Sequence, residues 1–435
     1  MKKTLWHEST RLADPACGYK WGWSTVNLTA AETNSCHRVD RDRFTADTFS
    51  EFHNTPAKRQ ARKKMLKNQW PGNGCEYCRD IEKAGGISDR LEFNNSRRNQ
   101  HYTPEELLNR SDTDPVPTSV FPTILEMYFT NLCNLGCVYC KPEYSSVLEN
   151  EAKKFPEFTR DKFFKIEEIN AKQSDTYEDR LKAFWDWFEE NAVKLKKYHI
   201  LGGEPFFQDE LIQNLEFFER KDDLSELEVT IFSNLKVPEK KFRNLLERFQ
   251  NLKLNNKLKE INIVCSLDCW GPQQEYIRTG LNMSDWERNF NILLNDFKSI
   301  ELEIHGTITG MSIGTMPDLV TKWIKWKETR DLLLTFNLCF DPSTMAPSIF
   351  KRGFFAEDFR KMYTQLSEDN GRERDLKGIL LGLEKFIDYS KGNLKLVRNL
   401  QKELREFDKR RGTDHTVLFP WLDVYINDEW KKLQP

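Results

Sequence analysis

The sequence predicts an α/β fold built on a parallel β-sheet whose helices all lie outside it. After residue 118, short β-rich runs alternate with longer amphipathic stretches, which is the pattern of repeated βα units. Within the short runs, polar and apolar residues alternate, so one face of the sheet is polar and the other apolar. A sheet covered by helices on both faces is apolar on both. The sequence therefore favours an open half-barrel with a polar concave cavity over a doubly wound sheet.

Six runs form the expected strands, each rich in β-branched and aromatic residues. They cover 123–130, 198–203, 227–234, 260–268, 301–309 and 332–340, with helices expected between them at 177–196, 285–297 and 316–326. The polar face is expected to carry Glu126, Tyr128, Thr130, His199, Thr230, Asn234, Asn262, Ser266, Asp268, Glu303, His305, Thr307, Thr309, Thr335, Asn337 and Cys339.

The chain divides into four expected regions. Residues 1–100 are polar and rich in cysteine, and they form a small module. Residues 101–118 carry three prolines and form a linker. Residues 119–345 hold the βα repeats, and 346–435 form helices with dense mixed charge.

Composition excludes several classes of protein. Lys and Arg total 66 and Asp and Glu 68, a formal charge of −2, so no global positive field exists to hold nucleic acid or an anionic membrane. No apolar run reaches 18 residues and no secretory signal is visible, so we expect a soluble, cytoplasmic protein.

The segment 57–70 is strongly basic. A solvated helix is expected there, and a nucleic-acid contact with Trp70, Arg97 and Arg98 is the alternative.

Three cysteines follow the first expected strand. TNLCNLGCVYCKP places Cys133, Cys137 and Cys140 in a C-x3-C-x2-C spacing. Three thiolates on one short loop can bind three irons of a cubane cluster and leave the fourth iron open for chemistry. The alternative is a zinc knuckle without its fourth ligand, since no histidine is close to the loop in sequence and the next one along the chain, His199, is distant.

This loop resembles that of the radical S-adenosylmethionine superfamily, whose defining motif is this cysteine spacing after the first strand of a partial (β/α)6 barrel. LGGEP at 201–205 is similar to the family's GGE motif, and GTITG at 306–310 is similar to its G-x-I-x-G pattern, without the glutamate sometimes seen further along. YIRTG at 276–280 resembles the arginine-bearing segment after the fourth strand. The resemblance implies a radical SAM barrel over 119–345, with a 4Fe-4S cluster and S-adenosylmethionine as cofactors.

The resemblance also implies which residues contact these cofactors. Cys133, Cys137 and Cys140 would be the catalytic cluster ligands, and Gly202, Gly203 and Glu204 would hold the amino group of the methionine moiety. The other contacts are expected from Tyr139 and Ile308 at the adenine, Ser233, Asn234, Ser266 and Asp268 at the ribose and carboxylate, and Arg278 at the carboxylate.

The N-terminal region offers a second set of thiols. Cys17, Cys36, Cys75 and Cys78 can saturate either a cubane cluster or a tetrahedral zinc ion. A cysteine, a nearby tryptophan, a short hairpin ending in cysteine and then a C-x2-C pair resemble the Twitch half of the SPASM/Twitch domain, which more often follows the barrel. The resemblance implies an auxiliary iron-sulfur cluster, with structural zinc and unmetallated thiols as alternatives.

The resemblance implies reductive cleavage of S-adenosylmethionine to a 5′-deoxyadenosyl radical that abstracts hydrogen from a substrate. A peptide or protein substrate is expected, with small-molecule dehydrogenation or rearrangement as the alternative and a flavodoxin or ferredoxin as the reductant. An alternative of a different functional class also remains open, a zinc-stabilised nucleic-acid-binding module.

Cys265 is expected in the core. Cys269 and Cys339 are candidate hydrogen-atom donors, and His199 and His305 are candidate acid/base groups.

Overall fold

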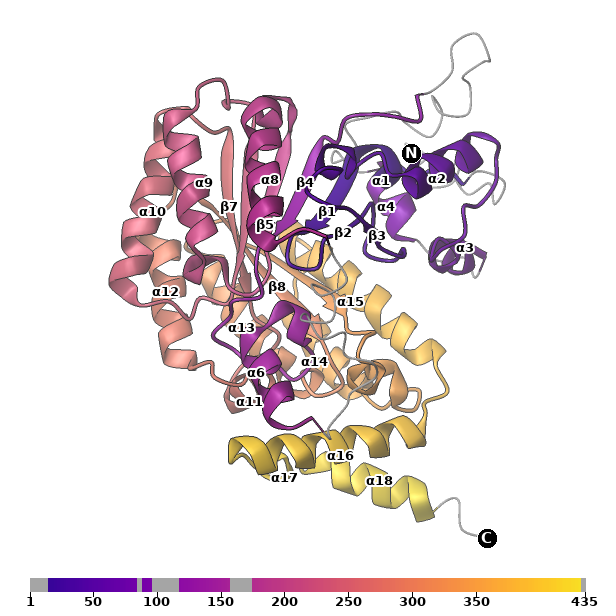
Figure 1. The fold of residues 1–435 in the computed structure, drawn as a ribbon. Helices are drawn as coiled ribbons and strands as arrows, with labels where there is room; N and C mark the ends of the chain where they lie inside the picture. The colour runs from indigo at the N-terminus through magenta and orange to yellow at the C-terminus, as the bar shows by residue number, and fades with distance from the viewer. Residues whose placement is uncertain (1–14, 84–87, 96–116, 157–173, 432–435) are drawn as a thin grey trace.

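A computed structural model gives the arrangement of the chain (Figure 1). The structure describes residues 15–83, 88–95, 117–156 and 174–431. Most of the expected linker at 101–118 lies outside the described residues, and so do Arg97 and Arg98.

In the described part of the chain, one nine-stranded sheet has the order β3-β2-β1-β4-β5-β6-β7-β8-β9. From β4 to β9 every neighbouring pair is parallel and the strands follow in chain order. Over β4 to β9 the order never reverses, unlike that of a doubly wound sheet; beyond β4 the sheet continues through β1 into the antiparallel strands β2 and β3. The α/β class and the six expected strands are therefore confirmed. The strands are β1 (Trp23–Asn27), β2 (Glu32–Asn34), β3 (Asp42–Arg43), β4 (Ile124–Tyr128), β5 (Lys197–Leu201), β6 (Glu228–Ser233), β7 (Glu260–Ser266), β8 (Glu301–Ile308) and β9 (Leu333–Leu338).

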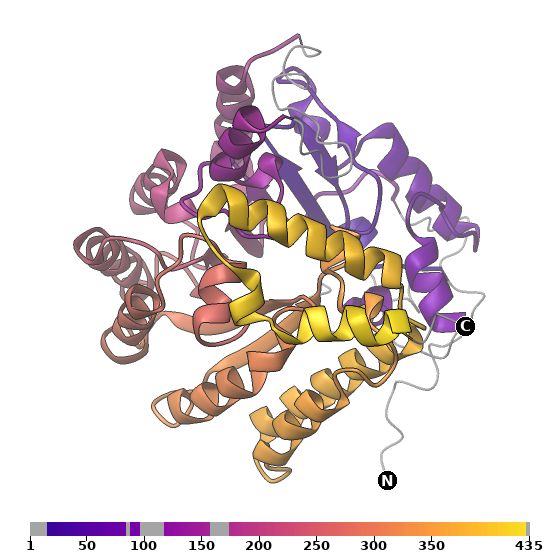
Figure 2. The same ribbon diagram turned by 90° about the horizontal axis from the view of Figure 1, so that it is seen from below.

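Contacts between β4 and β9 show that the sheet curls. Neighbouring strands lie about 4.8 Å apart, so a flat sheet would separate the first and sixth parallel strands by more than about 20 Å. Yet Lys141, in the segment after β4, forms an ion pair with Asp341, just after β9. The carboxyl ends of the two strands therefore lie close together. Figure 2 shows the helices from purple α8 to orange α13 in an arc outside the strands.

Burial along the strands confirms the expected alternation. On β8, Leu302, Ile304 and Ile308 are buried while Glu303 and His305 are half-buried. The apolar side chains pack beneath the amphipathic helices, which leaves the polar side chains on the inside of the curl. The helices of this region are α6 (Ser146–Lys154), α8 (Tyr177–Asn191), α9 (Asp209–Arg220), α10 (Glu239–Leu254), α11 (Pro272–Ile277), α12 (Met283–Asp296) and α13 (Met316–Trp326).

The N-terminal region continues the same sheet. β1 runs parallel to β4 over its whole length, with Trp23 opposite Ile124, and β2 returns antiparallel to β1 as the hairpin before Cys36. The strands of the expected module thus share a sheet with the βα repeats. Its helices are α1 (Tyr19–Gly22), α2 (Pro56–Leu66), α3 (Glu76–Lys83) and α4 (Asp89–Asn95).

The basic helix α2 differs from the prediction of a solvated helix. Thr55 caps its N-terminus and Pro56 occupies its first turn, but Lys58 and Arg62 are buried. Arg62 donates to the carbonyl oxygens of Lys20, His53 and Thr118. Lys58 donates to the hydroxyls of Ser24 and Thr33 and to the carbonyl of Phe52. The prediction was wrong for Lys58 and Arg62 because these partners come from distant segments and leave no signal in the sequence of the helix.

The C-terminal helices lie across the carboxyl ends of the strands, as the yellow segment of Figure 2 shows. Tyr276, in α11, donates to Asp408, and Arg411 donates to Thr279 and pairs with Glu151. Phe419 is buried, and its ring packs against that of Tyr276. These helices are α14 (Ala356–Gln365), α15 (Gly371–Tyr389), α16 (Leu394–Arg411), α17 (His415–Leu418) and α18 (Trp421–Lys431).

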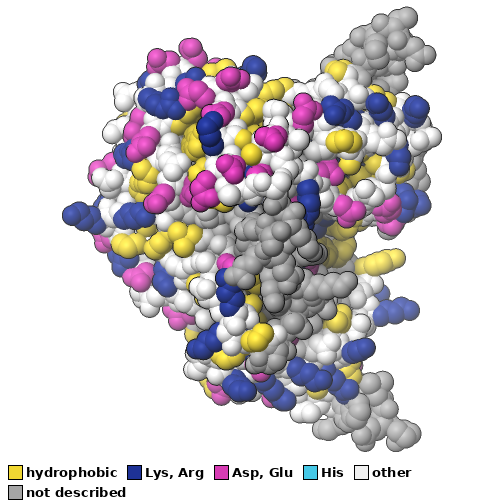
Figure 3. Space-filling view, in the orientation of Figure 1, with side chains coloured by type: hydrophobic (Ala, Val, Ile, Leu, Met, Phe, Trp, Pro, Cys, Tyr) yellow, Lys and Arg dark blue, Asp and Glu magenta, His cyan; other side chains and the backbone are white. Residues whose placement is uncertain are grey.

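Two surface properties bear on function. On the face shown in Figure 3, Lys and Arg side chains are interleaved with Asp and Glu over α8, α9 and α10. Among the described residues, no helix is both long and apolar enough to span a bilayer.

Candidate functional site

The three-cysteine loop follows β4 and is held by the segment 277–279. The backbone N–H of Gly136 donates to the carbonyl of Thr279 at 2.9 Å, and that of Val138 donates to Ile277 at 2.8 Å. Two of the motifs that the sequence singled out, the cysteine loop and YIRTG, therefore lie side by side. Arg278 lies between Ile277 and Thr279, whose carbonyls accept these two hydrogen bonds, and is thereby placed next to the cysteine loop.

The three thiols converge. Burial, together with the neighbouring Cys137 thiol, raises the pKa of Cys133 to about 12. Burial and the thiols of Cys137 and Cys133 also raise the pKa of Cys140. For Cys137, burial raises the pKa, while the Arg278 guanidinium opposes that shift. Each thiol lies within electrostatic reach of another, so the loop can present all three sulfur atoms to one metal group.

The LGGEP turn packs directly on this loop. Gly202 and Gly203 have φ values of +89° and +52°, in the left-handed region that favours glycine. A Cβ on Gly203 would lie 2.1 Å from the carbonyl oxygen of Leu132, so only glycine fits. The N–H of Glu204 donates to the same carbonyl at 2.8 Å. The turn after β5 and the loop after β4 are therefore one packed unit.

Glu204 is fully buried, and its carboxylate accepts hydrogen bonds from the end of β6. Its carboxylate accepts from Ser233 Oγ at 2.8 Å, from the Asn234 N–H at 2.7 Å and from the Phe206 N–H at 3.2 Å. Burial outweighs these hydrogen bonds and raises the pKa of Glu204 to about 7. A cationic ligand near this carboxylate would stabilise its ionised form.

Asp268, just beyond β7, forms a buried two-pronged ion pair with Arg278. Arg278 Nε and Nη2 each lie 2.9 Å from one carboxylate oxygen. Tyr139 Oη donates to Asp268 Oδ2 at 3.0 Å, and the N–H of Thr307 donates to Oδ1 at 2.8 Å. One carboxylate thus joins the cysteine loop, the YIRTG segment and β8.

Most of the predicted cofactor contacts meet at this end of the sheet. The structure brings together the three cysteines, Tyr139, the glycine turn with Glu204, Ser233 and Asn234, and the Asp268–Arg278 pair; Ser266 lies half-buried at the end of β7. Two of the residues that the resemblance assigned to the cofactor already have partners within the chain. Arg278 is paired with Asp268 within the chain, and Ile308 is fully buried in the core.

The four N-terminal cysteines line one cavity. Cys17, Cys36, Cys75 and Cys78 surround it together with Lys20 and Arg90. Burial raises the pKa of all four thiols, for Cys78 to about 11, and the Lys20 ammonium opposes that shift at Cys17, Cys36 and Cys75. The cavity is therefore lined by four thiols whose sulfur atoms could bind a metal group, with the Lys20 ammonium beside them.

Sulfur spacing tests which metal group this cavity fits. Among the residues that the structure describes, neither cysteine set brings three sulfur atoms within 4.8 Å of one another. Four sulfur ligands around one zinc ion, at Zn–S distances of about 2.3 Å, stand only about 4 Å apart. A cubane cluster spreads its cysteine ligands further. In neither set do three sulfur atoms stand as close together as the ligands of one zinc ion.

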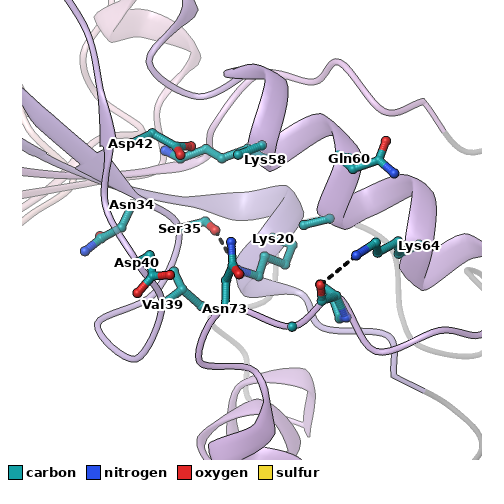
Figure 4. A pocket seen from close by; sticks show the side chains of 14 residues that line it. Lys20, Asn34, Ser35, Val39, Asp40, Asp42, Lys58, Gln60, Lys64 and Asn73 are labelled. Carbon is teal, nitrogen blue, oxygen red and sulfur yellow. Dashed lines mark hydrogen bonds between the residues drawn. The ribbon is translucent and has the colours of Figure 1, made fainter.

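Lys20 separates the cysteine cavity from a second pocket. Its ammonium is buried and donates to Ser35 Oγ at 3.1 Å, and Lys58 and Asn73 line the same pocket (Figure 4). In the described part of the chain, Lys20 forms no ion pair with a carboxylate. A buried ammonium is costly without a negative partner. A dianionic metal–thiolate centre in the adjacent cavity would supply that partner.

Sequence reasoning missed a cluster between the two cysteine sets. His37, the neighbour of Cys36, lies 3.2 Å from Glu126 on β4, and His199 on β5 lies 3.7 Å from the other carboxylate oxygen. The ring of Trp23 contacts both imidazoles. Alternation along β4 placed Glu126 on the polar face, but no sequence signal linked it to His37.

Comparison with known proteins adds little. No protein-family model and no curated protein matches the chain. One solved structure that matches is Streptococcus suis SuiB bound to precursor peptide SuiA, at 12% identity and a TM-score of 0.32, over 89% of this chain and 69% of that one. At this TM-score the likeness supports no conclusion about fold or function.

The glycine turn can be tested by substitution. We expect Gly203→Ala to lower the free energy of unfolding by about 3 kcal/mol or more, because the new methyl group meets a backbone oxygen and the positive φ is strained. Urea unfolding followed by circular dichroism measures the change. Gly314→Ala is the matched control: no atom lies within 4 Å of its added Cβ, so it should change stability by less than about 0.5 kcal/mol. Equal stability of the two variants would contradict the packing of the turn.

Glu204 makes stability depend on pH. Because its folded pKa is raised to about 7, its protonated form stabilises the fold at low pH, and that contribution is lost as pH rises from 4.5 to 7. Relative to Glu204→Gln, the wild type without added ligand should lose about 3 kcal/mol of unfolding free energy over this range. Parallel pH profiles of the two proteins would refute the buried, proton-binding state of Glu204.

Proposed function

We propose that this chain is a radical S-adenosylmethionine enzyme. The observation that carries the proposal is the convergence of a C-x3-C-x2-C loop, a glycine turn ending in a buried glutamate, and an Asp–Arg pair at the carboxyl end of one curled parallel sheet. When bound at Cys133, Cys137 and Cys140, a 4Fe-4S cluster supplies one electron that cleaves S-adenosylmethionine to methionine and a 5′-deoxyadenosyl radical, which takes hydrogen from the substrate.

The chain's own residues would bind and orient the cofactor. Glu204, next to the cysteine loop, supplies a carboxylate for the methionine amino group, and binding that cation would lower its raised pKa. Tyr139 and Asp268 fix the far side of the loop. Because Arg278 already neutralises Asp268, its proposed contact with the methionine carboxylate would share the guanidinium between two anions.

The N-terminal cysteines would hold an auxiliary iron-sulfur cluster. The wide sulfur spacing and the buried Lys20 beside the thiols support a cluster over zinc. Four protein ligands leave no open iron, so this centre would transfer electrons or stabilise the region instead of binding substrate.

Burial of Lys58 and Arg62 disfavours the alternative of a nucleic-acid-binding module, because two cations of the basic segment face the protein interior.

The proposed substrate is a peptide or protein. The second candidate is a small molecule that the enzyme would dehydrogenate. A cytoplasmic location and a flavodoxin- or ferredoxin-type reductant belong to the same proposal.

Cysteine variants test the proposal directly. Cys133→Ala, Cys137→Ala and Cys140→Ala should each abolish 5′-deoxyadenosine formation, because each removes one of three iron ligands. The assay is chromatography with mass spectrometry on anaerobically reconstituted protein supplied with S-adenosylmethionine and dithionite. Cys265→Ala is the control: this thiol is fully buried in the core strand β7, so its loss should leave the product in place. Product formation by any of the three loop variants would sink the ligand assignment.

Metal analysis tests the second centre. Protein purified without oxygen should contain about eight irons and about eight sulfides per chain, and the double variant Cys75→Ala/Cys78→Ala about four of each. The cysteine-loop variants should retain the N-terminal cluster, which gives the two sets reciprocal controls. One zinc per chain, lost in the double variant, would instead make the N-terminal site structural.

A further inference from the structure

One buried amide ties the glycine turn to the three-cysteine loop. Gln208 stands at the start of α9 and is only 2% exposed. Its Nε2 donates to the carbonyl oxygens of Gly202 at 2.5 Å, Thr130 at 3.3 Å and Leu132 at 3.4 Å. Gly202 belongs to the turn after β5, whereas Thr130 and Leu132 lie in the loop after β4, just before Cys133. A single side chain therefore holds two segments of the proposed cofactor site together.

The carbonyls fix the orientation of this amide. Carbonyl oxygens only accept hydrogen bonds, so the NH2 group of Gln208 faces them and its Oε1 atom faces away. In the described part of the chain, Oε1 is buried and has no hydrogen-bond partner. A buried acceptor without a partner is unfavourable. The favourable contribution of the side chain must therefore come from its two N–H groups.

The start of a helix does not by itself call for glutamine. Gln208 is the N-cap residue of α9, a position where serine, threonine, aspartate and asparagine are favoured because their short side chains accept from the first free N–H groups of the helix. The side chain of Gln208 forms no such cap and extends across the turn and the loop instead. A residue that breaks a local rule is expected to serve a site.

The same contacts determine where Glu204 stands. The carbonyl of Leu132, to which Gln208 donates, also accepts the N–H of Glu204 at 2.8 Å. Gly202, two residues before Glu204, has a φ of +89°, and a glycine peptide rotates easily unless a partner holds its carbonyl. Gln208 thus restrains the backbone that leads into Glu204 and the loop carbonyl on which Glu204 rests.

We propose that Gln208 is a positioning residue for the methionine end of S-adenosylmethionine, an inference that rests on the proposed function. The amide fixes the separation between the Glu204 carboxylate, which would bind the methionine amino group, and the loop whose thiols would hold the cluster. A ligand that contacts two groups binds more tightly when their separation is set before it arrives, because binding then orders less of the protein.

Amide hydrogen exchange of the full-length protein, read by peptide mass spectrometry, tests whether Gln208 holds the turn. Gln208→Met removes the N–H donors and keeps a similar shape, so exchange in peptides covering 201–207 should become about tenfold faster, the effect of one hydrogen bond. Gln208→Lys keeps a donor and should restore the protection, since the buried Lys58 ammonium is held by two hydroxyls and a carbonyl in the same chain.

Asn214→Leu is the matched control. Asn214 is a fully buried amide on the same helix, and its Nδ2 donates to the carbonyl of Glu210 one turn earlier, away from the glycine turn. This variant should lower the midpoint of unfolding and leave exchange at 201–207 at the wild-type rate. Equal exchange in Gln208→Met and wild type overturns the proposal.

Cofactor affinity is the second readout. The dissociation constant for S-adenosylmethionine, measured by equilibrium dialysis on anaerobically reconstituted proteins of matched iron content, should rise about tenfold in Gln208→Met. It should return toward the wild-type value in Gln208→Lys and stay unchanged in Asn214→Leu. A purely structural role would lower the midpoint of unfolding without changing this constant, and that result overturns the proposal.

Failure of the proposed function gives a different pattern. A wild type that binds no S-adenosylmethionine overturns the proposed function, and the cofactor role of Gln208 falls with it. Exchange at 201–207 needs no cofactor, so faster exchange in Gln208→Met would still show that the amide holds the turn on the loop.

Discussion

The buried pair of Asp268 and Arg278 is the interaction on which the site depends. Arg278 reaches Asp268 from the segment 277–279, whose neighbouring carbonyls hold the backbone of the cysteine loop. Asp268 in turn accepts from Tyr139 on that loop and from the backbone of β8. Removing one partner would leave a buried charge uncompensated, which costs several kcal/mol. The pair therefore fixes the loop after β4 relative to β7 and β8, three strands away.

Local pattern predicted the strands well because their signal lies within a few residues. Alternation of polarity gave all six parallel strands to within a few positions and placed Glu303 and His305 on the polar face. The sequence also placed the cysteine loop after the first expected strand and the LGGEP turn after the second, and the two motifs do follow neighbouring parallel strands.

Partners in space could not be predicted in the same way. Nothing in the sequence of β1, which is buried along its whole length, shows that it pairs parallel with β4 some 100 residues later. The charges of α2 predicted exposure, whereas Arg62 is buried because three carbonyls from separate segments accept its protons. The YIRTG motif indicated Arg278 as a candidate contact to an external carboxylate, but it gave no sign of the internal partner, Asp268, that the fold brings next to it. In each of these cases the two partners are not identified by any local pattern: nothing in the sequence around one of them indicates the other.

The N-terminal region touches both edges of the curled sheet. Through β1 it joins β4, and Arg41 pairs with Glu143 just after the cysteine loop. From α3, the ring of Tyr77 contacts Phe340, which follows β9. The two cysteine sets are therefore held in one rigid network of strand pairing, ion pairs and ring contacts, as an electron transfer between them would require.

Charge bears on how the two proposed metal sites would bind metal. Burial raises the pKa of every thiol in the two sets, so at neutral pH the free thiols stay protonated. Arg278 is already paired with Asp268, whereas Lys20 forms no ion pair with a carboxylate in the described part of the chain. Binding metal releases those protons and creates the thiolates that Lys20 and Arg278 face. The same positive charges would then make each centre easier to reduce, because a nearby cation stabilises the extra electron. The folded chain thus gains stability from the groups that would carry its chemistry, and the two effects have one electrostatic origin.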